Sequence, residues 1–405
     1  MWENLTSGRE RGGIKLTNKI KRVPNRYIVS IIVFIVLIST FTLVVKAEPV
    51  FETKAESAIL MDYGTGKILY EHNPKEKLPV ASINKIMTLL LTYEAIEDGT
   101  LNLNDKVTIS DHAASMGGSQ VFLHEGEVLP VDALLKAVIL ASANDASVAL
   151  AEKIAGTHEV FVKRMNDRAK ELGMNDTSFA NATGLPAQNS YSTAYDVAIM
   201  SRELLKQPLF YKWSTVWVDI LKESKNNTAL ANTNRLVRFY EGADGVKTGS
   251  TSEAGYCLSA TAKRGDMRLI AIVLGAPNSK IRFSEASKLL DYGFANYKTK
   301  LIQKKDQIIQ KDIKISGGKT NLINGLASRD ISLLLKIDDK DDFNRTILID
   351  DKLRAPIERG DKIGSLRIEI DGKTVDTIDI ISDRNVSKAG LIDYIKRIFN
   401  SLIRK

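Results

Sequence analysis

The chain has 405 residues, 44% of them hydrophobic and 26% charged, which is typical of a globular protein with two or three domains. Its net charge of +8 does not indicate nucleic-acid binding, because residues 1–46 hold eight basic and two acidic residues. The rest, with 49 basic and 47 acidic residues, carries only +2. A single cysteine, Cys257, excludes an internal disulfide and is expected to be a small buried hydrophobe. Four scattered histidines argue against a zinc site.

Residues 27–45 form an uncharged apolar segment that follows a basic flank. The flank predicts that the N-terminus stays inside the cell and that the following chain is exported. Nineteen residues are just enough to span a bilayer, while Val45-Lys46-Ala47 offers a small-residue cleavage site. We therefore expect a cytoplasmic basic segment and then a signal peptide or membrane anchor, and both alternatives stay open. Either places the folded part at the outer face of the cytoplasmic membrane.

A β-hairpin is predicted at residues 56–72 and a buried helix next, with Ser82 in its first turn and Gly99 after its end. Ser82 and Lys85 are three residues apart and share one helix face. Backbone N–H groups at a helix start are unpaired and carry partial positive charge. The serine would thus have a base within reach and donors for an oxyanion. An S-x-x-K tetrad alone is nevertheless a weak signal.

The rest of the chain divides into a helical block, a strand block and a small β-rich region. Helices are predicted at residues 131–142, 145–154, 160–172 and 195–205, after short strands and loops at 106–128. Strands follow at residues 246–250, 256–263 and 267–274, and then a helix that Ser279 caps and that runs to Tyr297. From about Thr299, short alternating segments predict a separate all-β domain.

The last residues, 388–405, keep apolar side chains at helical spacing with lysines and arginines on the other face. This pattern favours an amphipathic helix that contacts a membrane surface over a terminal helix packed on the β-domain. We therefore expect four parts: a basic segment with signal or anchor at 1–47, a catalytic domain at 50–298, a β-sandwich-like domain at 300–384 and a membrane-associating helix at 388–405.

Two further triplets strengthen the Ser82 signal. Ser142-Ala143-Asn144 lies at a predicted helix end, and Lys247-Thr248-Gly249 lies on a predicted strand. The order S-x-x-K, S-x-N, K-T-G, with a helical block between the last two, matches penicillin-recognising serine acyltransferases. The chain resembles the low-molecular-weight penicillin-binding proteins of type 5, which are D-alanyl-D-alanine carboxypeptidases of peptidase family S11. The resemblance extends to these further stretches: 61–67, 181–185, 255–258, 289–294 and 360–364.

Residues 233–237 and 249–254 resemble most the sporulation-associated branch of that family. The resemblance implies an α/β catalytic domain, in which helices and an inserted helical subdomain flank an antiparallel sheet as in β-lactamases and transpeptidases, plus a small C-terminal all-β domain. It also implies removal of the terminal D-alanine from peptidoglycan stem pentapeptides. β-Lactams are expected as covalent inhibitors, and no cofactor, metal or nucleic acid is expected.

The resemblance also implies catalytic roles for four residues. Ser82 would be the nucleophile that forms the acyl ester. Lys85 would be its general base, because burial removes the amine from water and a second cation lies nearby. Ser142 would relay a proton to the leaving amine, and Asn144 would hold Lys85 or the substrate amide.

Substrate binding is expected on the K-T-G strand. Lys247 and Thr248 would receive the terminal carboxylate, and Gly249 would let the substrate backbone lie against the strand. The backbone N–H groups of Ser82 and Ser250 would form the oxyanion hole.

Two other functions compete with this interpretation. A class A β-lactamase needs a glutamate to activate water; Glu171 is a candidate, but it is expected on the solvent face of its helix. An inactive wall-peptide-binding protein of the same fold is disfavoured by the three intact triplets. The motifs leave transpeptidase and endopeptidase activities open. The chain departs from relatives before Tyr191, where they often carry a histidine, so any function of that histidine is in doubt here.

Overall fold

The computed structural model describes residues 52–339, 342–370, 372–393 and 395. The apolar segment predicted at residues 27–45 and most of the helix predicted at 388–405 lie outside these described residues. Across the described part of the chain, none of the helices is both long and apolar enough to cross a membrane.

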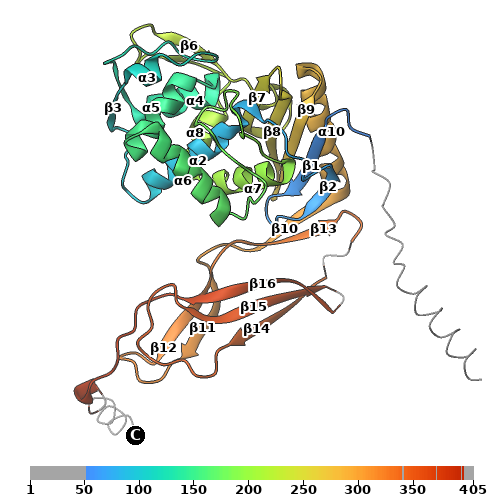
Figure 1. The fold of residues 1–405 in the computed structure, drawn as a ribbon. Helices are drawn as coiled ribbons and strands as arrows, with labels where there is room; N and C mark the ends of the chain where they lie inside the picture. The colour runs from blue at the N-terminus through green and yellow to red at the C-terminus, as the bar shows by residue number, and fades with distance from the viewer. Residues whose placement is uncertain (1–51, 340–341, 371, 394, 396–405) are drawn as a thin grey trace, which may run out of the picture. The chain divides into compact units, whose positions relative to one another are not determined.

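A five-stranded antiparallel sheet in the order β2-β1-β9-β8-β7 forms the centre of the larger domain (Figure 1). Its strands are β1 (Ser57–Asp62), β2 (Ile68–His72), β7 (Ala243–Thr251), β8 (Gly255–Arg264) and β9 (Met267–Ala276). The first two form the predicted hairpin. Strand β1 also pairs with β9, so the start of the domain is joined to a segment about 200 residues later. Among the described strands, β7 pairs only with β8, so it forms an edge of the sheet.

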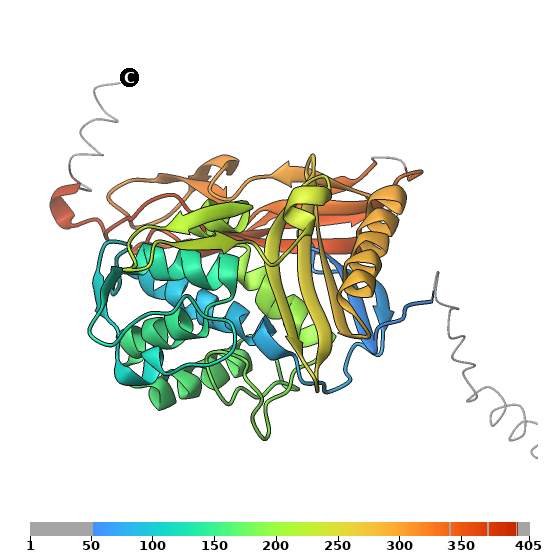
Figure 2. The ribbon, with the colours of Figure 1, turned by 90° about the horizontal axis from the view of Figure 1, so that it is seen from above.

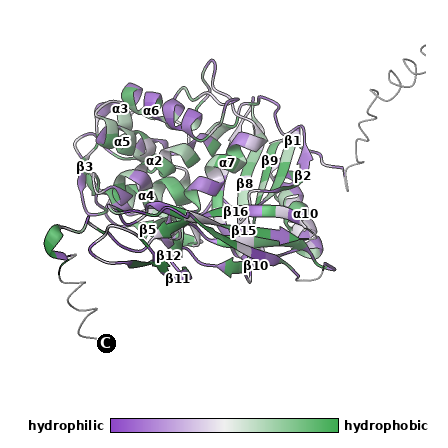
Figure 3. Cartoon of the chain, turned by 90° about the horizontal axis from the view of Figure 1, so that it is seen from below, coloured by the Kyte–Doolittle hydropathy of each residue, from purple (hydrophilic) through white to green (hydrophobic). Residues whose placement is uncertain are grey.

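Both faces of the sheet are covered, because alternate residues of β9 belong to two different cores. Ile270 and Ile272 pack with the helical block, whereas Leu269 and Ala271 pack under the last helix. A strand that is buried on both faces has a nearly continuous apolar sequence, and most of β9 is coloured as hydrophobic in Figure 3. Figure 2 shows the sheet between the helical block and α10.

Helix α10 (Ser279–Asn296) covers the outer face of the sheet. Ser279, the predicted cap, is the first helical residue. The cap is Asn278, whose side chain accepts a hydrogen bond of 2.9 Å from the backbone N–H of Ile281. Asparagine and serine are both good N-caps, so two adjacent candidates could not be separated by sequence.

The helical block packs on the inner face and confirms the predicted α/β fold class. Its main helices are α2 (Lys85–Glu97), α3 (Asp111–Ala114), α4 (Val131–Ala141), α5 (Asn144–Ala155), α6 (His158–Glu171) and α7 (Ala194–Leu204). Helix α2 runs through the middle of this block, and nine of its thirteen residues are buried. A helix that is apolar on most sides must be enclosed by its neighbours, and α2 contacts α5, α6 and α7.

Strands β3 (Lys106–Thr108) and β4 (Val128–Pro130) lie at the two ends of the stretch 106–128, where short strands and loops were predicted. Other short elements had no prediction of their own: η2 (Pro208–Phe210), α8 (Tyr211–Ser214), β5 (Val218–Leu221), β6 (Thr228–Ala231) and α9 (Leu236–Phe239). Each has three or four residues, which is too short for hydrophobic periodicity to appear.

The C-terminal β-domain contains a five-stranded sheet, β11-β12-β16-β15-β14, and the pair β10-β13. Their bounds are β10 (Tyr297–Gln303), β11 (Ile308–Lys314), β12 (Leu322–Ala327), β13 (Ile331–Lys336), β14 (Asn344–Ile349), β15 (Lys362–Ile370) and β16 (Lys373–Ser382). Strand β12 escaped prediction because Gly325 interrupts its pattern. A Cβ at Gly325 would lie 2.4 Å from Ile380, so glycine permits the close approach of β16.

Candidate active site

Ser82 lies in η1 (Ala81–Asn84), a single 3₁₀ turn that leads into α2. The α-helix itself begins at Lys85, slightly later than the sequence predicts. Lys85 Nζ lies 3.0 Å from Ser82 Oγ. The serine is half-buried and the lysine fully buried, so the hydroxyl is at the surface of the site and the amine beneath it.

Two carbonyl oxygens complete the surroundings of the Lys85 amine. Nζ donates to Asn144 Oδ1 and to the backbone oxygen of Thr183, both at 2.6 Å. Burial, and then the charge of Lys247, hold the pKa of Lys85 well below its usual range, against the opposing charge of Asp145. A buried lysine near a second cation is a setting that favours the neutral amine.

The second triplet joins α4 to α5. Ser142 adopts a left-handed conformation (φ 59°) directly after α4. Its Oγ is buried and has no hydrogen-bond partner within the described residues. Asn144 begins α5 and donates from Nδ2 to the oxygen of Gly117 at 2.6 Å. This bond fixes the orientation of the amide, so that Oδ1 faces Lys85.

Asp145, the next residue, holds the loop that packs on Asn144. Its buried carboxylate accepts from the backbone N–H groups of Val121 (3.0 Å) and Leu123 (3.1 Å). Burial raises the pKa of Asp145, although these N–H donors oppose the rise. The Asp145 carboxylate is therefore occupied by backbone N–H groups of the loop and is not free to act on a water molecule.

Lys247 lies on β7 with 1% of its surface exposed. Burial, and next the charge of Arg282, lower its pKa to about 7. Arg282, from α10, donates to the oxygens of Gly249 (3.2 Å) and Cys257 (3.3 Å). Arg282 was missed by sequence analysis; the available signal was a charged residue on the apolar face of the predicted helix.

The remaining residues of the third triplet lie against the Ser82 turn. A Cβ at Gly249 would lie 3.0 Å from the Ser82 nitrogen and 2.7 Å from the Val80 oxygen, so only glycine allows this approach. Thr248 Oγ1 donates to Thr233 Oγ1 at 2.8 Å. Ser250 is exposed at the end of the strand.

The loop 181–185 contacts both members of the Ser–Lys pair. Asn181 Oδ1 accepts from the N–H groups of Thr183 (3.1 Å) and Gly184 (2.7 Å) and so folds the loop. Gly184 has φ +77°, and a Cβ there would lie 2.0 Å from the Ala81 oxygen. Sequence analysis identified this loop by resemblance but assigned it no contact with Ser82 or Lys85.

Other sequence candidates lie elsewhere or in the core. Glu171 ends α6, pairs with Arg168 at 3.0 Å and has 63% of its side chain exposed. Cys257 is fully buried, as expected. Within the described residues, no group of three or more His, Cys, Asp or Glu could hold a metal ion.

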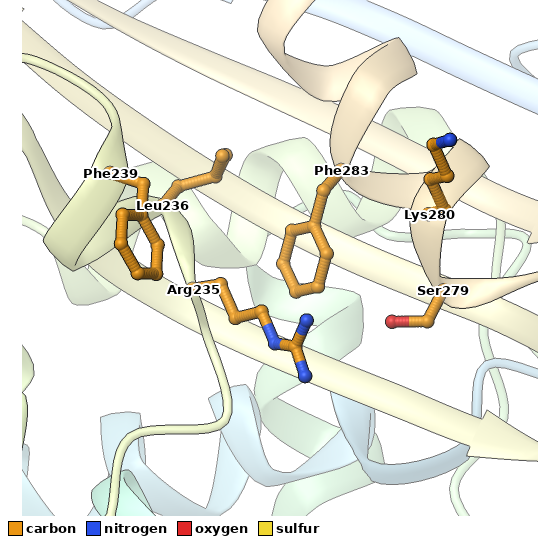
Figure 4. A pocket seen from close by; sticks show the side chains of 6 residues that line it. All are labelled: Arg235, Leu236, Phe239, Ser279, Lys280 and Phe283. Atoms are coloured by element: carbon orange, nitrogen blue, oxygen red, sulfur yellow. The ribbon is translucent and has the colours of Figure 1, made fainter.

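A cavity of about 540 Å³ lies between α9 and α10 (Figure 4). It is lined by Arg235, Leu236, Phe239, Ser279, Lys280 and Phe283. Within the described residues, the hydrogen-bond partners of the Lys85 amine, which are Ser82, Asn144 and Thr183, are not among these lining residues, whereas Ser279 accepts a hydrogen bond of 3.2 Å from Arg282.

The Ser–Lys pair lies at the start of a central helix, next to an asparagine and to a buried lysine of the sheet edge, and this arrangement within a sheet covered by helices is a penicillin-binding protein fold. A family model described as D-alanyl-D-alanine carboxypeptidase matches residues 43–278. A second model, the C-terminal domain of penicillin-binding protein 5, matches residues 297–388. The chain belongs to the D-alanyl-D-alanine carboxypeptidase family S11.

Individual relatives agree with this assignment. The chain is 46% identical to D-alanyl-D-alanine carboxypeptidase DacF of Bacillus subtilis, over 85% of this chain and 89% of the relative. It is 35% identical to DacC of Escherichia coli, over 83% and 85%. The structure of penicillin-binding protein 5 from Haemophilus influenzae matches with a TM-score of 0.68 and 32% identity, over 84% of this chain and 99% of that one. Ampicillin-bound penicillin-binding protein D2 of Listeria monocytogenes matches with a TM-score of 0.55 and 32% identity, over 61% and 100%.

Proposed function

We propose that the protein is a serine-type D-Ala-D-Ala carboxypeptidase that removes the terminal D-alanine from stem pentapeptides through an acyl-enzyme on Ser82. The family to which it belongs acts on peptidoglycan peptides and binds β-lactams. The observation that carries the residue assignment is the surroundings of the Lys85 amine.

Three oxygens surround Lys85 Nζ, and this arrangement can accommodate either an ammonium ion or a neutral amine; the lowered pKa of Lys85 favours the neutral amine. A neutral amine has two N–H donors and one lone pair. The oxygens of Asn144 and Thr183 take the two N–H groups, both at 2.6 Å. The lone pair then faces Ser82 Oγ at 3.0 Å, where it can accept the hydroxyl proton as the oxygen attacks a carbonyl.

The charge of Lys247 has two uses in this proposal. Its proximity disfavours protonation of Lys85, and its ammonium group can bind the terminal carboxylate of the substrate. With a pKa of about 7, Lys247 is partly neutral in the empty site. The carboxylate of an incoming substrate favours the charged form of Lys247, so substrate binding would bring Lys247 to full protonation.

The other site residues take the remaining steps. Ser142 Oγ has no partner within the described residues, so it can pass a proton to the leaving D-alanine amine. Asn144 orients Lys85, and Thr248 supports carboxylate binding. The N–H groups of Ser82 and Ser250 would stabilise the oxyanion. Water then attacks the acyl ester on Ser82, the peptide leaves, and the serine proton is restored.

The position of Glu171 disfavours the β-lactamase alternative. It is exposed and paired with Arg168, and the only carboxylate acting on Lys85 in the described part of the chain is Asp145. We therefore expect penicillin to remain on Ser82, because Glu171, the candidate for activating water, lies on the solvent side of α6 and pairs with Arg168.

We further propose the division of the chain into residues 1–47, 50–298, 300–384 and 388–405, with export directed by the first part and membrane contact by the last. Members of this family are cell-wall enzymes that act outside the cytoplasm, which supports export. The basic amphipathic pattern of 388–405 supports membrane contact. N-terminal sequencing of the mature protein distinguishes cleavage from retention, and fractionation of a chain lacking 388–405 tests the contact. Membership of the sporulation-associated branch is also proposed, supported by the resemblance at 233–237 and 249–254; expression timing tests it.

Labelling with fluorescent penicillin tests the nucleophile. Ser82→Ala is expected to abolish labelling, whereas Ser284→Ala, at an exposed serine of α10, should label like the wild type. Labelled Ser82→Ala protein would show that the nucleophile lies elsewhere.

The reaction is tested with a pentapeptide substrate. Release of D-alanine without dimer formation or cleavage of cross-links supports a carboxypeptidase. Dimer formation would favour a transpeptidase, and cleavage of cross-links an endopeptidase. Lys85→Arg keeps the charge but cannot lose the proton, so full activity of this variant would place the base elsewhere.

A further inference from the structure

The loop 181–185 determines where the Lys85 amine lies. The Thr183 oxygen accepts one of its N–H groups at 2.6 Å, and Gly184 lies against the turn that carries Ser82. Thr183 is 2% exposed, so its carbonyl cannot exchange this partner for bulk water. A small rotation of the Thr183 peptide unit would therefore change the position of the amine.

Ala182 fixes that loop on the side away from Ser82. Its carbonyl accepts from Thr88 Oγ1 at 2.8 Å. Its N–H donates to Nε2 of His158 at 3.2 Å. Ala182 is fully buried, so His158 is the acceptor of a donor that has no access to solvent. His158 is the first residue of α6 and is itself half-buried.

We propose that His158 is a positioning residue for Lys85, and that its neutral imidazole, by accepting the Ala182 N–H, holds the adjacent Thr183 carbonyl where the amine needs it. This inference rests on the proposed role of Lys85 as the base. His158 does not touch the reacting atoms, and its effect passes through the backbone of Ala182 and Thr183.

The groups around His158 favour the neutral ring that this bond requires. Imidazole accepts at Nε2 only when Nε2 carries no proton. The His112 ring, from α3, meets the His158 ring edge-on with centroids 5.3 Å apart. Burial, and then His112, lower the pKa of His158, while the charges of Glu159 and Glu152 oppose them.

Glu152, from α5, is already engaged by other donors. His112 Nδ1 lies 2.8 Å from its Oε1, and Ser110 Oγ donates to its Oε2 at 2.6 Å. Glu159 follows His158 in α6 and is exposed. Glu152 is therefore bonded to His112 and Ser110 and not to the His158 ring.

Three variants test the proposal through the second-order rate of Ser82 acylation by labelled penicillin. His158→Phe keeps a ring but removes the acceptor, and acylation is expected to fall about tenfold, the effect of leaving a buried N–H unpaired. His158→Gln supplies an oxygen that can accept the same N–H, and should stay within about threefold of wild type. His72→Phe, in the edge strand β2 at the far side of the sheet, is the matched control and should acylate normally.

The pH profile separates positioning from mere packing. The ratio of wild-type to His158→Gln rates cancels the titration of Lys85 and Lys247, because both proteins contain these groups. Protonation of His158 removes its acceptor, whereas glutamine does not titrate. The ratio is therefore expected to be flat at neutral and alkaline pH and to fall only below about pH 6.5, the ordinary value for histidine, because the pKa of His158 is lowered.

Two outcomes would overturn the proposal. One is a His158→Phe protein that acylates like wild type. The other is a loss that His158→Gln shares in full, with a ratio that does not change with pH, which would indicate a packing role. If His158→Phe does not fold, the glutamine variant and the pH ratio still decide. Failure of the proposed function gives a different result, namely a wild-type protein that penicillin does not label at Ser82.

Discussion

Replacement of Gly184 by alanine tests whether the contact between loop 181–185 and the Ser82 turn controls catalysis. A Cβ at this position would lie 2.0 Å from the Ala81 oxygen and 2.9 Å from the Ser82 nitrogen, against an ordinary contact distance of at least 3.4 Å. The loop and the turn would have to separate by about 1 Å or more. A displacement of this size at a reacting group reduces rates by about 10²-fold.

The matched control is Gly173→Ala. Gly173 has the same φ of +77°, but a Cβ there would meet nothing within 4 Å. Both variants incur the left-handed backbone penalty of about 1–2 kcal/mol. Only Gly184→Ala adds the steric term, about 1–3 kcal/mol for overpacking. The difference between the two proteins therefore isolates the contact with Ala81 and Ser82.

The assay combines the rate of Ser82 acylation by labelled penicillin with thermal unfolding of each variant. We expect Gly173→Ala to melt somewhat earlier but to acylate at the wild-type rate. Gly184→Ala should melt earlier still and acylate about 10²-fold more slowly at a temperature where it is fully folded. Equal acylation by the two folded variants would refute the argument, because the close approach would then have no catalytic consequence.

Three further outcomes follow from buried groups. Lys247 has a folded pKa of about 7 and an unfolded pKa of about 10.4, so the unfolded chain binds more protons between these values and stability should rise with pH there. Lys247→Met should reduce that slope by up to about 1.4 kcal/mol per pH unit, measured by urea unfolding at pH 7 to 10. Asp244→Ala leaves Arg268 buried without its two bonds of 2.6 and 2.7 Å and should cost about 3–5 kcal/mol in the same assay; a loss under 1 kcal/mol would contradict this. Thr233→Val removes the acceptor of the Thr248 hydroxyl and should raise KM for a pentapeptide about threefold to tenfold with little change in kcat, whereas an unchanged KM would show that the bond does not orient Thr248.

Sequence motifs predicted those parts of the site that depend on side-chain identity. Ser82 and Lys85 share a turn, so their contact follows from spacing alone. Asn144 and Lys247 were assigned to the site from the recognised order of the three triplets. They lie about 60 and 160 residues after Lys85, and local spacing does not predict that residues so far apart in sequence meet at its amine.

Backbone groups and buried charges were the parts that sequence could not supply. The Thr183 carbonyl is chemically identical to every other carbonyl, and only the fold selects it as a partner of Lys85. Arg282 looked like an ordinary helix residue until α10 was seen to pack it under Gly249. The fold class, by contrast, was predictable from sequence. Long elements such as β9 and α2 contain enough residues for their hydrophobic pattern to indicate a strand or a helix.

The edge of β7 also bears on the solubility of the protein. A free sheet edge can pair with the edge of another molecule and so start aggregation. Here the first residues of the strand are already occupied: Ser214 Oγ donates to the Asp244 oxygen at 2.6 Å, and Asn234 Nδ2 donates to the Gly245 oxygen at 2.7 Å. The part of the edge left for an incoming chain is therefore the short stretch from Val246 to Thr251. A segment of six residues beside a turn is long enough to hold one peptide, but it offers little to a neighbouring sheet.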